Sequence, residues 1–235
     1  MAAKTKASGA KSRWRWLFAP FKWLTILVLG YLVACTLLLV AYRWVPPPTT
    51  TVQLQRLVEN AASGEPYRLV YSPVAEDDQD IDARHAAVAS EDGRFYLHNG
   101  FDLEEIRIAR EQARARGVSP RGASTITQQL VKNLFLTTHR SWIRKGFEVP
   151  LTFIAELVLP KERILTLYLN VAEWGPGIFG LNAAAQHHYG TSASALTREQ
   201  SARLVAVLPA PLERSPQQMG RTSSRILTRM RQMGW

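Results

Sequence analysis

The chain has 235 residues and a formal net charge of +10, a length that suits one or two domains. A strongly basic chain raises the question of nucleic-acid binding. However, six of its 29 basic side chains lie in the first 22 residues, which hold no acidic residue and lead into an apolar run. A membrane role explains this distribution better, so we expect no nucleic-acid partner. The single cysteine, Cys35, excludes an intrachain disulfide and a cysteine-based metal site.

The apolar run at residues 23–42 carries no charge. At about 1.5 Å per residue it spans roughly 30 Å, the thickness of a bilayer core, and aromatic residues flank both of its ends. A cleaved signal peptide is the alternative, but no convincing small-x-small cleavage site follows the run. We predict an uncleaved transmembrane helix over residues 23–43 in the cell inner membrane. The positive-inside rule predicts that the basic tail, residues 1–22, is cytoplasmic and that the rest of the chain is periplasmic.

Residues 44–51, rich in proline and threonine, are expected to form a stiff linker. Residues 52–235 are expected to form one mostly helical domain. Helix formers and caps predict helices over residues 81–90, 103–116, 124/125–136, 142–159, 160–170, 181–189, 197–207 and 222–233. Pro150 should kink or end the helix that contains it. Gly175, Gly177 and Gly180 mark a loop, and residues 67–71 are the best candidate for a short strand.

The first cluster of possible catalytic residues is at residues 91–102, which contain Glu91, Asp92, His98 and Asp102. Three carboxylates and a histidine lie close together in the sequence, among glycines. The plain interpretation is a polar loop beside a helix cap. The functional interpretation is that a carboxylate at a helix end, near aromatic residues and partly desolvated, serves as a general base.

The second cluster, residues 121–133, reads RGASTITQQLVKN. On a helix, Gln128 and Gln129 lie four and three residues before Lys132, so the three share a face. The start of such a helix presents free backbone N–H groups with Arg121 just before it, a combination that suits a phosphate or pyrophosphate. The alternative is an ordinary capped helix with a solvated polar face.

The third cluster consists of Arg144, Lys145 and Glu148. Arg144 and Glu148 are four residues apart and can form an ion pair on one helix face. Lys145 is expected to face in a different direction. A surface salt bridge is the plain alternative for this pair.

Together these clusters resemble the motifs of the peptidoglycan glycosyltransferases of family 51, in particular the monofunctional biosynthetic transglycosylases. Residues 91–102 fit the pattern EDxxFxxHxGxD at every defined position, and residues 121–133 fit RG(G/A)STITQQLxKN. The patterns RKxxE, ILxxYLN and GxxG followed by AA match residues 144–148, 164–170 and 177–185, in the same order as in the family. Pro160, residues 188–190 and Gln200 depart from the family pattern away from these clusters.

The resemblance implies a mainly α fold, with a lysozyme-like helical domain and a smaller membrane-proximal lobe. We expect that lobe at residues 103–122, where four arginines suit anionic headgroups. The implied enzyme transfers the growing lipid-linked glycan chain onto the 4-hydroxyl of lipid II and releases undecaprenyl pyrophosphate. An inverting single displacement would form the β-1,4 bond. The implied partners are lipid II, the nascent strand and the bilayer, with cell-division or penicillin-binding proteins as further candidates.

The resemblance also implies roles for individual residues. Glu91 corresponds to the general base and Glu148 to the family's second catalytic carboxylate. The residues implied in substrate or pyrophosphate binding are Arg121, Ser124, Thr125, Gln128, Gln129, Lys132, Asn133, Arg144 and Lys145. Supporting motif residues are Asp92, Phe95, His98, Gly100, Asp102, Tyr168 and Asn170. No cofactor or protein-bound metal is expected to be required, although a divalent cation, Mg²⁺ or Mn²⁺, could bridge the pyrophosphate.

Two alternative functions could account for the same motifs. A lysozyme-like hydrolase or lytic transglycosylase would cut glycan, but such an enzyme has no pyrophosphate to hold with the basic residues of the second and third clusters. An inactive membrane scaffold would not need every motif residue. Incubation with lipid II separates synthesis from cutting, because a synthase makes polymer and a hydrolase digests sacculi.

Overall fold

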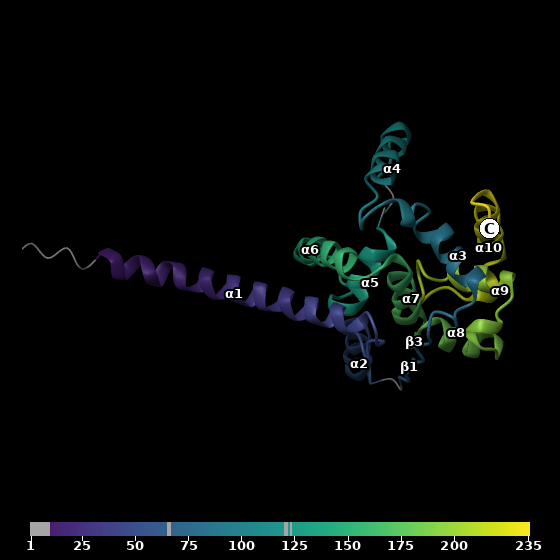
Figure 1. Ribbon diagram of the computed structural model, residues 1–235, viewed down its shortest axis with the longest axis horizontal. Coiled ribbons are helices and arrows are strands. Elements are labelled where there is room, and N and C mark those ends of the chain that lie inside the picture. The colour runs from purple at the N-terminus through teal and green to yellow at the C-terminus, as the bar shows by residue number, and fades with distance from the viewer. Residues whose placement is uncertain (1–9, 65–66, 120–121, 123) are drawn as a thin grey trace, which may run out of the picture.

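The structure is a computed structural model that describes residues 10–64, 67–119, 122 and 124–235. A helix of 33 residues, α1 (Ala10–Tyr42), extends away from a helical body (Figure 1). Its part from Pro20 to Tyr42 has a mean hydropathy of 2.6 and is long and apolar enough to cross a membrane. The predicted apolar helix is therefore confirmed, and the helix begins earlier in the chain than predicted.

The C-terminal end of α1 is fastened to the body. Cys35, Leu39 and Tyr42 are buried there, whereas most of the apolar part is exposed. The Tyr31 hydroxyl donates to the Phe135 backbone oxygen at 2.6 Å, and Arg163 Nε donates to the Tyr42 backbone oxygen at 2.7 Å. Because the last carbonyls of a helix lack partners within the helix, a cation is a favourable cap there.

Residues 43–50 lead from α1 into α2 (Thr51–Ser63), a helix that the sequence analysis did not predict. Thr50 caps it, since the Thr50 hydroxyl accepts from the Gln53 backbone N–H and the Gln53 side chain accepts from the Thr50 N–H. This reciprocal capping box is a strong helix start. The Thr51 hydroxyl then donates to the Leu136 backbone oxygen at 2.5 Å, which ties α2 to the segment that follows the second cluster.

The remaining helices agree closely with the predicted ranges. They are α3 (Ile81–Glu91), α4 (Leu103–Arg116), α5 (Ile126–Phe135), α6 (Trp142–Val158), α7 (Lys161–Val171), α8 (Leu181–Tyr189), α9 (Arg198–Val205) and α10 (Gly220–Gln232). Short 3₁₀ turns are η1 (Phe95–Leu97), η2 (Ala193–Ala195) and η3 (Pro216–Gln218). The body is thus mainly helical, as expected.

Two local predictions need correction. The helix α6 continues through Pro150 and does not end there, because buried residues before and after the proline, among them Glu148 and Leu151, hold both halves against the body. The glycine-rich segment is more than a loop. It forms β2 (Glu173–Gly175) and β3 (Ile178–Phe179), and β3 also pairs with β1 (Val70–Tyr71) in a three-stranded sheet.

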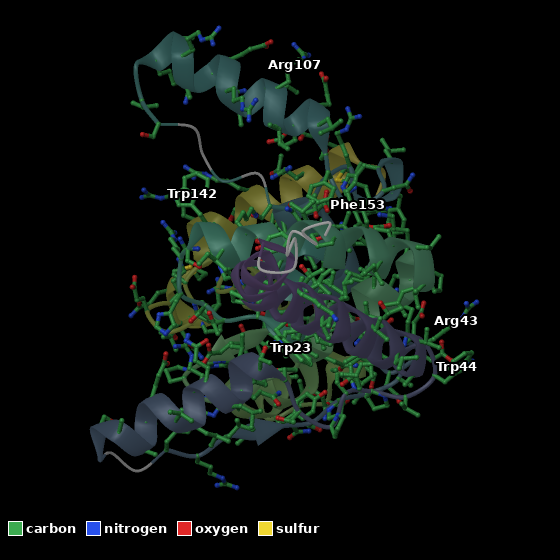
Figure 2. All side chains as sticks on the ribbon, turned by 90° about the vertical axis from the view of Figure 1, so that its left-hand side faces the viewer. Trp23, Arg43, Trp44, Arg107, Trp142 and Phe153 are labelled. Carbon is green, nitrogen blue, oxygen red and sulfur yellow. The ribbon has the colours of Figure 1, made fainter. Side chains whose placement is uncertain are left out.

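The core of the body lies between α5, α7, α3 and α8, where the largest fully buried side chains include Trp174, Tyr168 and Phe95. The helix α4 projects away from this core in Figure 1. Arg107, labelled at the outer part of Figure 2, pairs there with Glu104 at 2.5 Å and Glu111 at 2.7 Å. These carboxylates neutralise part of the positive charge that the four arginines were expected to offer to headgroups.

Candidate active site

The described residues form two neighbouring clefts. The first, of about 300 Å³, is lined by residues 90–94 together with side chains of α10 and the start of α4. The second, of about 410 Å³, is lined by residues of α5, α6 and α7. Ser124 lines both clefts. Glu91 lines the first cleft and is hydrogen-bonded to Gln129, which lines the second. Glu91 therefore lies at the boundary between the two clefts.

Glu91 is the last residue of α3. Its two side-chain oxygens accept hydrogen bonds from neutral groups, the Ser90 hydroxyl and Gln129 Nε2, each at 3.1 Å. Burial raises the pKa of Glu91, and the hydrogen bonds from Gln129 and Ser90 and the charge of Lys132 oppose this only in part. A carboxylate that has a raised pKa and forms no ion pair with a described residue is suited to accept a proton near neutral pH.

Gln129 is itself held in place by Tyr168 on α7. The fully buried Tyr168 hydroxyl donates to Gln129 Oε1 at 3.1 Å, and this fixes the amide so that its Nε2 points at Glu91. Burial raises the pKa of Tyr168 well above its usual value, so the hydroxyl stays protonated and remains a donor. The motif residue Tyr168 thus acts on Glu91 through Gln129.

The start of α5 differs from the expectation of free N–H groups. Thr125 caps the helix, and its hydroxyl accepts from the Gln128 backbone N–H at 3.2 Å. The Ile126 backbone N–H donates to Asp92 Oδ2 at 3.0 Å. The expectation of free N–H groups is therefore wrong for Gln128 and Ile126, because the side chains of Thr125 and Asp92 already accept hydrogen bonds from them.

The first motif forms a support for this helix start. His98 Nε2 donates to Asp92 Oδ1 at 2.9 Å. Asp102 caps α4 by accepting from the Glu105 backbone N–H at 2.9 Å, and it pairs with Arg94 at 3.3 Å. Asp92 in turn binds Ile126, as described above. The acidic and histidine residues around Glu91 are thus engaged in positioning the backbone.

Gly100 and Phe95 contribute to the same support. The Gly100 backbone oxygen accepts from the Thr125 hydroxyl at 2.7 Å. Gly100 has a φ of +89°, and a Cβ there would lie 2.7 Å from Thr152 Cγ2, so only glycine fits. The Phe95 ring is fully buried, with Lys161 Nζ 4.4 Å from its centroid.

Within the described part of the chain, one group of possible metal ligands stands out, namely Asp92, His98 and Asp102. One ligand atom of each lies within 4.8 Å of the others. The sequence analysis expected no such group. However, both carboxylates already accept backbone N–H hydrogen bonds and pair with His98 or Arg94. The group is therefore suited to a structural role without an ion.

Glu148 lies in the second cleft with an exposed fraction of 2%. Arg144 Nη1 donates to its Oε2 at 2.7 Å, and Lys145 Nζ donates to its Oε1. Lys145 therefore faces the same carboxylate as Arg144, which corrects the expectation that it faces elsewhere. The buried position also excludes the alternative of a surface salt bridge. Gln128 Nε2 adds a contact at 3.4 Å from α5.

The second cleft is strongly cationic. Among the described residues, five cations line it, Arg56, Lys132, Arg140, Arg144 and Lys145, against two carboxylates, Glu148 and Glu173. Burial and the neighbouring Arg144 lower the pKa of Lys132. The amide side chains of Gln128 and Asn133 complete the polar lining. Such a site suits an anion that carries more than one negative charge.

Arg56 and Arg140 were not among the predicted site residues. Arg140 lies between the second and third clusters, so its place in the sequence gave a signal for it. Arg56 lies on α2, far from the motifs in sequence, and reaches the cleft while paired with Glu173 at 3.0 Å. No local pattern could have found it.

The other predicted residues are placed as follows. Asn170 holds the segment before α3, because its side chain accepts from the Val74 N–H at 3.1 Å and donates to the Val74 oxygen at 2.8 Å. It is thus a structural residue outside both clefts. Arg121 lies outside the described residues.

A family model described as transglycosylase matches residues 67–233. A protein of Chromohalobacter salexigens named biosynthetic peptidoglycan transglycosylase is 45% identical over 226 residues, covering 93% of this chain and 95% of the relative. Proteins of the same name from Pseudomonas putida KT2440 and Pseudomonas aeruginosa PAO1 are 45% and 42% identical, covering 79% and 88% of this chain and 78% and 89% of the relatives.

Proposed function

Because the chain belongs to the transglycosylase family and is a peptidoglycan glycosyltransferase, we propose that it polymerises glycan strands from lipid II. The growing lipid-linked chain is the donor, and the 4-hydroxyl of a lipid II molecule is the acceptor. The oxygen of this hydroxyl bonds to the anomeric carbon of the donor as the bond from that carbon to the pyrophosphate breaks. Undecaprenyl pyrophosphate leaves, and an α-linked donor becomes a β-1,4 product by inversion.

The position of Glu91 between the two clefts carries this proposal. In it, Glu91 accepts the proton of the attacking hydroxyl. The raised pKa of Glu91 makes it a stronger base than an exposed carboxylate. The neutral donors Ser90 and Gln129 orient it without neutralising it by an ion pair. Glu91 can therefore take the proton of the attacking hydroxyl while the new bond forms beside it and the leaving group occupies the adjoining cleft.

The cationic second cleft takes the pyrophosphate in this proposal. Negative charge grows on the pyrophosphate as the bond to the sugar breaks, and fixed cations lower the energy of that transition state. Lys132, Arg140, Arg144 and Lys145 line the cleft for this purpose. From the sequence motif, Arg121 is proposed as a further cation for this role.

Glu148 is proposed to position cations in this cleft. Both of its oxygens are engaged with Arg144 and Lys145, so neither is free to accept a proton from substrate. A buried carboxylate between two flexible cationic side chains fixes their heads in one arrangement. Glu148 thus acts through Arg144 and Lys145.

The residues of the second cleft do not fit a resident metal ion. Glu148 and Glu173, its two carboxylates among the described residues, already pair with cations. We therefore assign no chemical step to a metal. A divalent cation, where it takes part, would be carried by the pyrophosphate oxygens.

The body is proposed to lie against the outer face of the inner membrane. The helix α6 packs along α1, and the Tyr31 and Phe147 rings meet edge to face at 5.7 Å. The other side of α6 exposes large apolar side chains, including Trp142 at 92%, Leu157 at 87% and Phe153 at 58%. Figure 2 shows Trp142 and Phe153 from the side toward which α1 extends. Continuity with α1 favours lipid as the surface that covers them.

A hydrolase that cuts glycan is the second candidate, because a carboxylate with a raised pKa also serves hydrolysis. The five cations of the second cleft oppose it, since glycan hydrolysis releases no pyrophosphate.

The test incubates the full-length protein in detergent with lipid II, and separately with isolated sacculi. Polymer from lipid II without release of sacculus fragments is expected. Glu91→Gln should make no polymer, while the control Asp77→Asn, an exposed carboxylate change away from both clefts, should polymerise as the wild type does. Digestion of sacculi without polymer would overturn the proposal in favour of the hydrolase.

A further inference from the structure

The C-terminal helix α10 carries a row of arginines that the proposed reaction does not use. Arg221, Arg225 and Arg229 follow one another at intervals of four residues, so they share one face of the helix. The row extends about 12 Å along the axis at 1.5 Å per residue. All three side chains are exposed. None forms a hydrogen bond or ion pair with a described residue, unlike Arg107 of α4 and Arg231 of α10 itself.

One end of this row lies in the first cleft, beside Glu91. Arg229, Gln232 and Met233 line that cleft together with the end of α3. Arg229 Nη2 lies 3.1 Å from the place where a Cβ on Gly93 would be. The guanidinium therefore lies beside the backbone two residues after Glu91.

The helix is held firmly on α3 and α9. Ile226 and Met230 are buried on its opposite face. The Trp235 ring stacks on His85 of α3, with centroids 4.3 Å apart and planes at 4°. The Trp235 backbone oxygen accepts from Arg198 Nη2 on α9 at 2.7 Å. The row is therefore a fixed feature of the surface.

The location of the row excludes lipid headgroups as its ligand. Figure 1 shows α10 on the side of the body opposite to that from which α1 extends. A glycan strand, in contrast, must leave the active site away from the membrane as it grows. Each unit of that strand carries a peptide stem with carboxylates. The first cleft is lined by Glu91, Asp92 and Asp102 together with Arg94 and Arg229, so it offers acceptors to sugar hydroxyls, and the arginine row that begins there offers charge to carboxylates.

We propose that Arg221, Arg225 and Arg229 bind the peptide carboxylates of the nascent glycan strand as it leaves the first cleft along α10. This inference rests on the proposed polymerase function and adds a product-binding surface to it. Guanidinium groups suit carboxylates because they offer paired donors in the matching geometry. Binding here would keep the strand on the enzyme between additions and so favour long products.

The test measures the binding of two glycan oligomers to the full-length protein in detergent, by fluorescence anisotropy. One oligomer carries carboxylate-bearing peptide stems, and the other is a stem-free oligomer of N-acetylglucosamine of the same length, which carries no carboxylate. The variant replaces all three arginines with glutamine. Each exposed charge contact contributes a factor of about two to five, so we expect roughly tenfold weaker binding of the stem-bearing oligomer. Binding of the stem-free oligomer should not change.

Two further variants make the result specific. Arg231→Gln, on the same helix but bonded to Thr228 on another face, should bind both oligomers as the wild type does. Replacing the three arginines with lysine should restore part of the binding, because lysine keeps the charge but lacks the paired donors of the guanidinium group. Equal weakening for both oligomers, or no weakening for the stem-bearing one, would overturn the proposal.

Polymerisation of lipid II is measured in parallel, with strand length as the readout. Shorter strands from the triple glutamine variant would support the row as a product-binding surface. Failure of the wild type to make any polymer would overturn the proposed function, and the inference with it. Normal polymer from the wild type with stem-independent binding would overturn the arginine row alone.

Discussion

The end of α3 and the first turns of α6 each hold one carboxylate of the site, and their surroundings differ. Glu91 at the end of α3 receives hydrogen bonds from a serine and a glutamine, and burial raises its pKa. Glu148 on α6 is more deeply buried but is bonded to an arginine and a lysine. In the proposed mechanism, the neutral partners leave Glu91 able to accept a proton, whereas the cationic partners make Glu148 a positioning group.

The largest expected effect is on the rate, at Glu91. Glu91→Gln keeps the shape and can still contact Gln129 and Ser90, but the amide cannot take a proton. Loss of a general base lowers a rate by about 10²–10⁴-fold. We expect a fall of this size in the initial rate of lipid II polymerisation, measured with labelled substrate. A variant with more than a tenth of the wild-type rate would contradict the assignment.

The next largest expected effect is on thermal stability, which should differ between variants of the two regions. Glu148→Gln leaves Arg144 and Lys145 without their counterion, and because both are partly exposed the loss is about 1–3 kcal/mol. A chain of this size loses roughly 2–4 °C in Tm for each kcal/mol. We expect thermal unfolding to show this fall.

Glu91→Gln should change the stability of the folded protein in the opposite direction. A folded-state pKa above the unfolded value means that the ionised carboxylate destabilises the folded state once the pH exceeds the unfolded pKa. Glutamine removes this penalty, so the Tm at neutral pH should stay the same or rise. Equal destabilisation in both variants would break the distinction between the two regions.

The pH dependence tests the neutral partners of Glu91. The Gln129 hydrogen bond lowers the pKa of Glu91 and so opposes the effect of burial. In Gln129→Met the pKa should rise further, and the acidic limb of the kcat/KM profile should move to higher pH. The profile is measured from initial rates between acidic and neutral pH. A shift to lower pH would show that Gln129 does not stabilise the ionised form.

The smallest effect is expected at Tyr168. Tyr168→Phe removes the donor that orients Gln129 but leaves the amide in place. One neutral hydrogen bond is worth about 0.5–1.5 kcal/mol, so the rate should fall by roughly 2- to 12-fold. The acidic limb should shift less than in Gln129→Met. A larger shift than in Gln129→Met would mean that Tyr168 acts on Glu91 by another route.

The sequence predicted the helices well because their signals are local. Helices α4 and α8 occupy the predicted ranges, and α5 begins after the predicted cap Thr125. The strands β2 and β3 were missed because two or three residues among glycines show no alternation. The helix α6 does not end at Pro150, because burial on both sides of the proline holds the two halves against the body.

The sequence predicted the site residues that lie in the motifs. It did not predict the contacts that residues far apart in the sequence make at the site. The motif residues Gln129, Lys132 and Glu148 do gather in one cleft. No local rule predicts that Asp92 accepts a hydrogen bond from the Ile126 N–H or that Arg56 of α2 lines the second cleft. These contacts join segments far apart in sequence, so only the fold reveals them.

The most direct test of the central claim compares the pH–rate profiles of the wild type, Glu91→Gln and Glu148→Gln in the lipid II assay. The wild type should show an acidic limb with an apparent pKa above that of an ordinary glutamate, because burial raises the pKa of Glu91. Glu148→Gln should be slower but keep that limb. Glu91→Gln should lose both the rate and the limb. A limb that persists in Glu91→Gln and vanishes in Glu148→Gln would contradict the account, because it would make Glu148 the base.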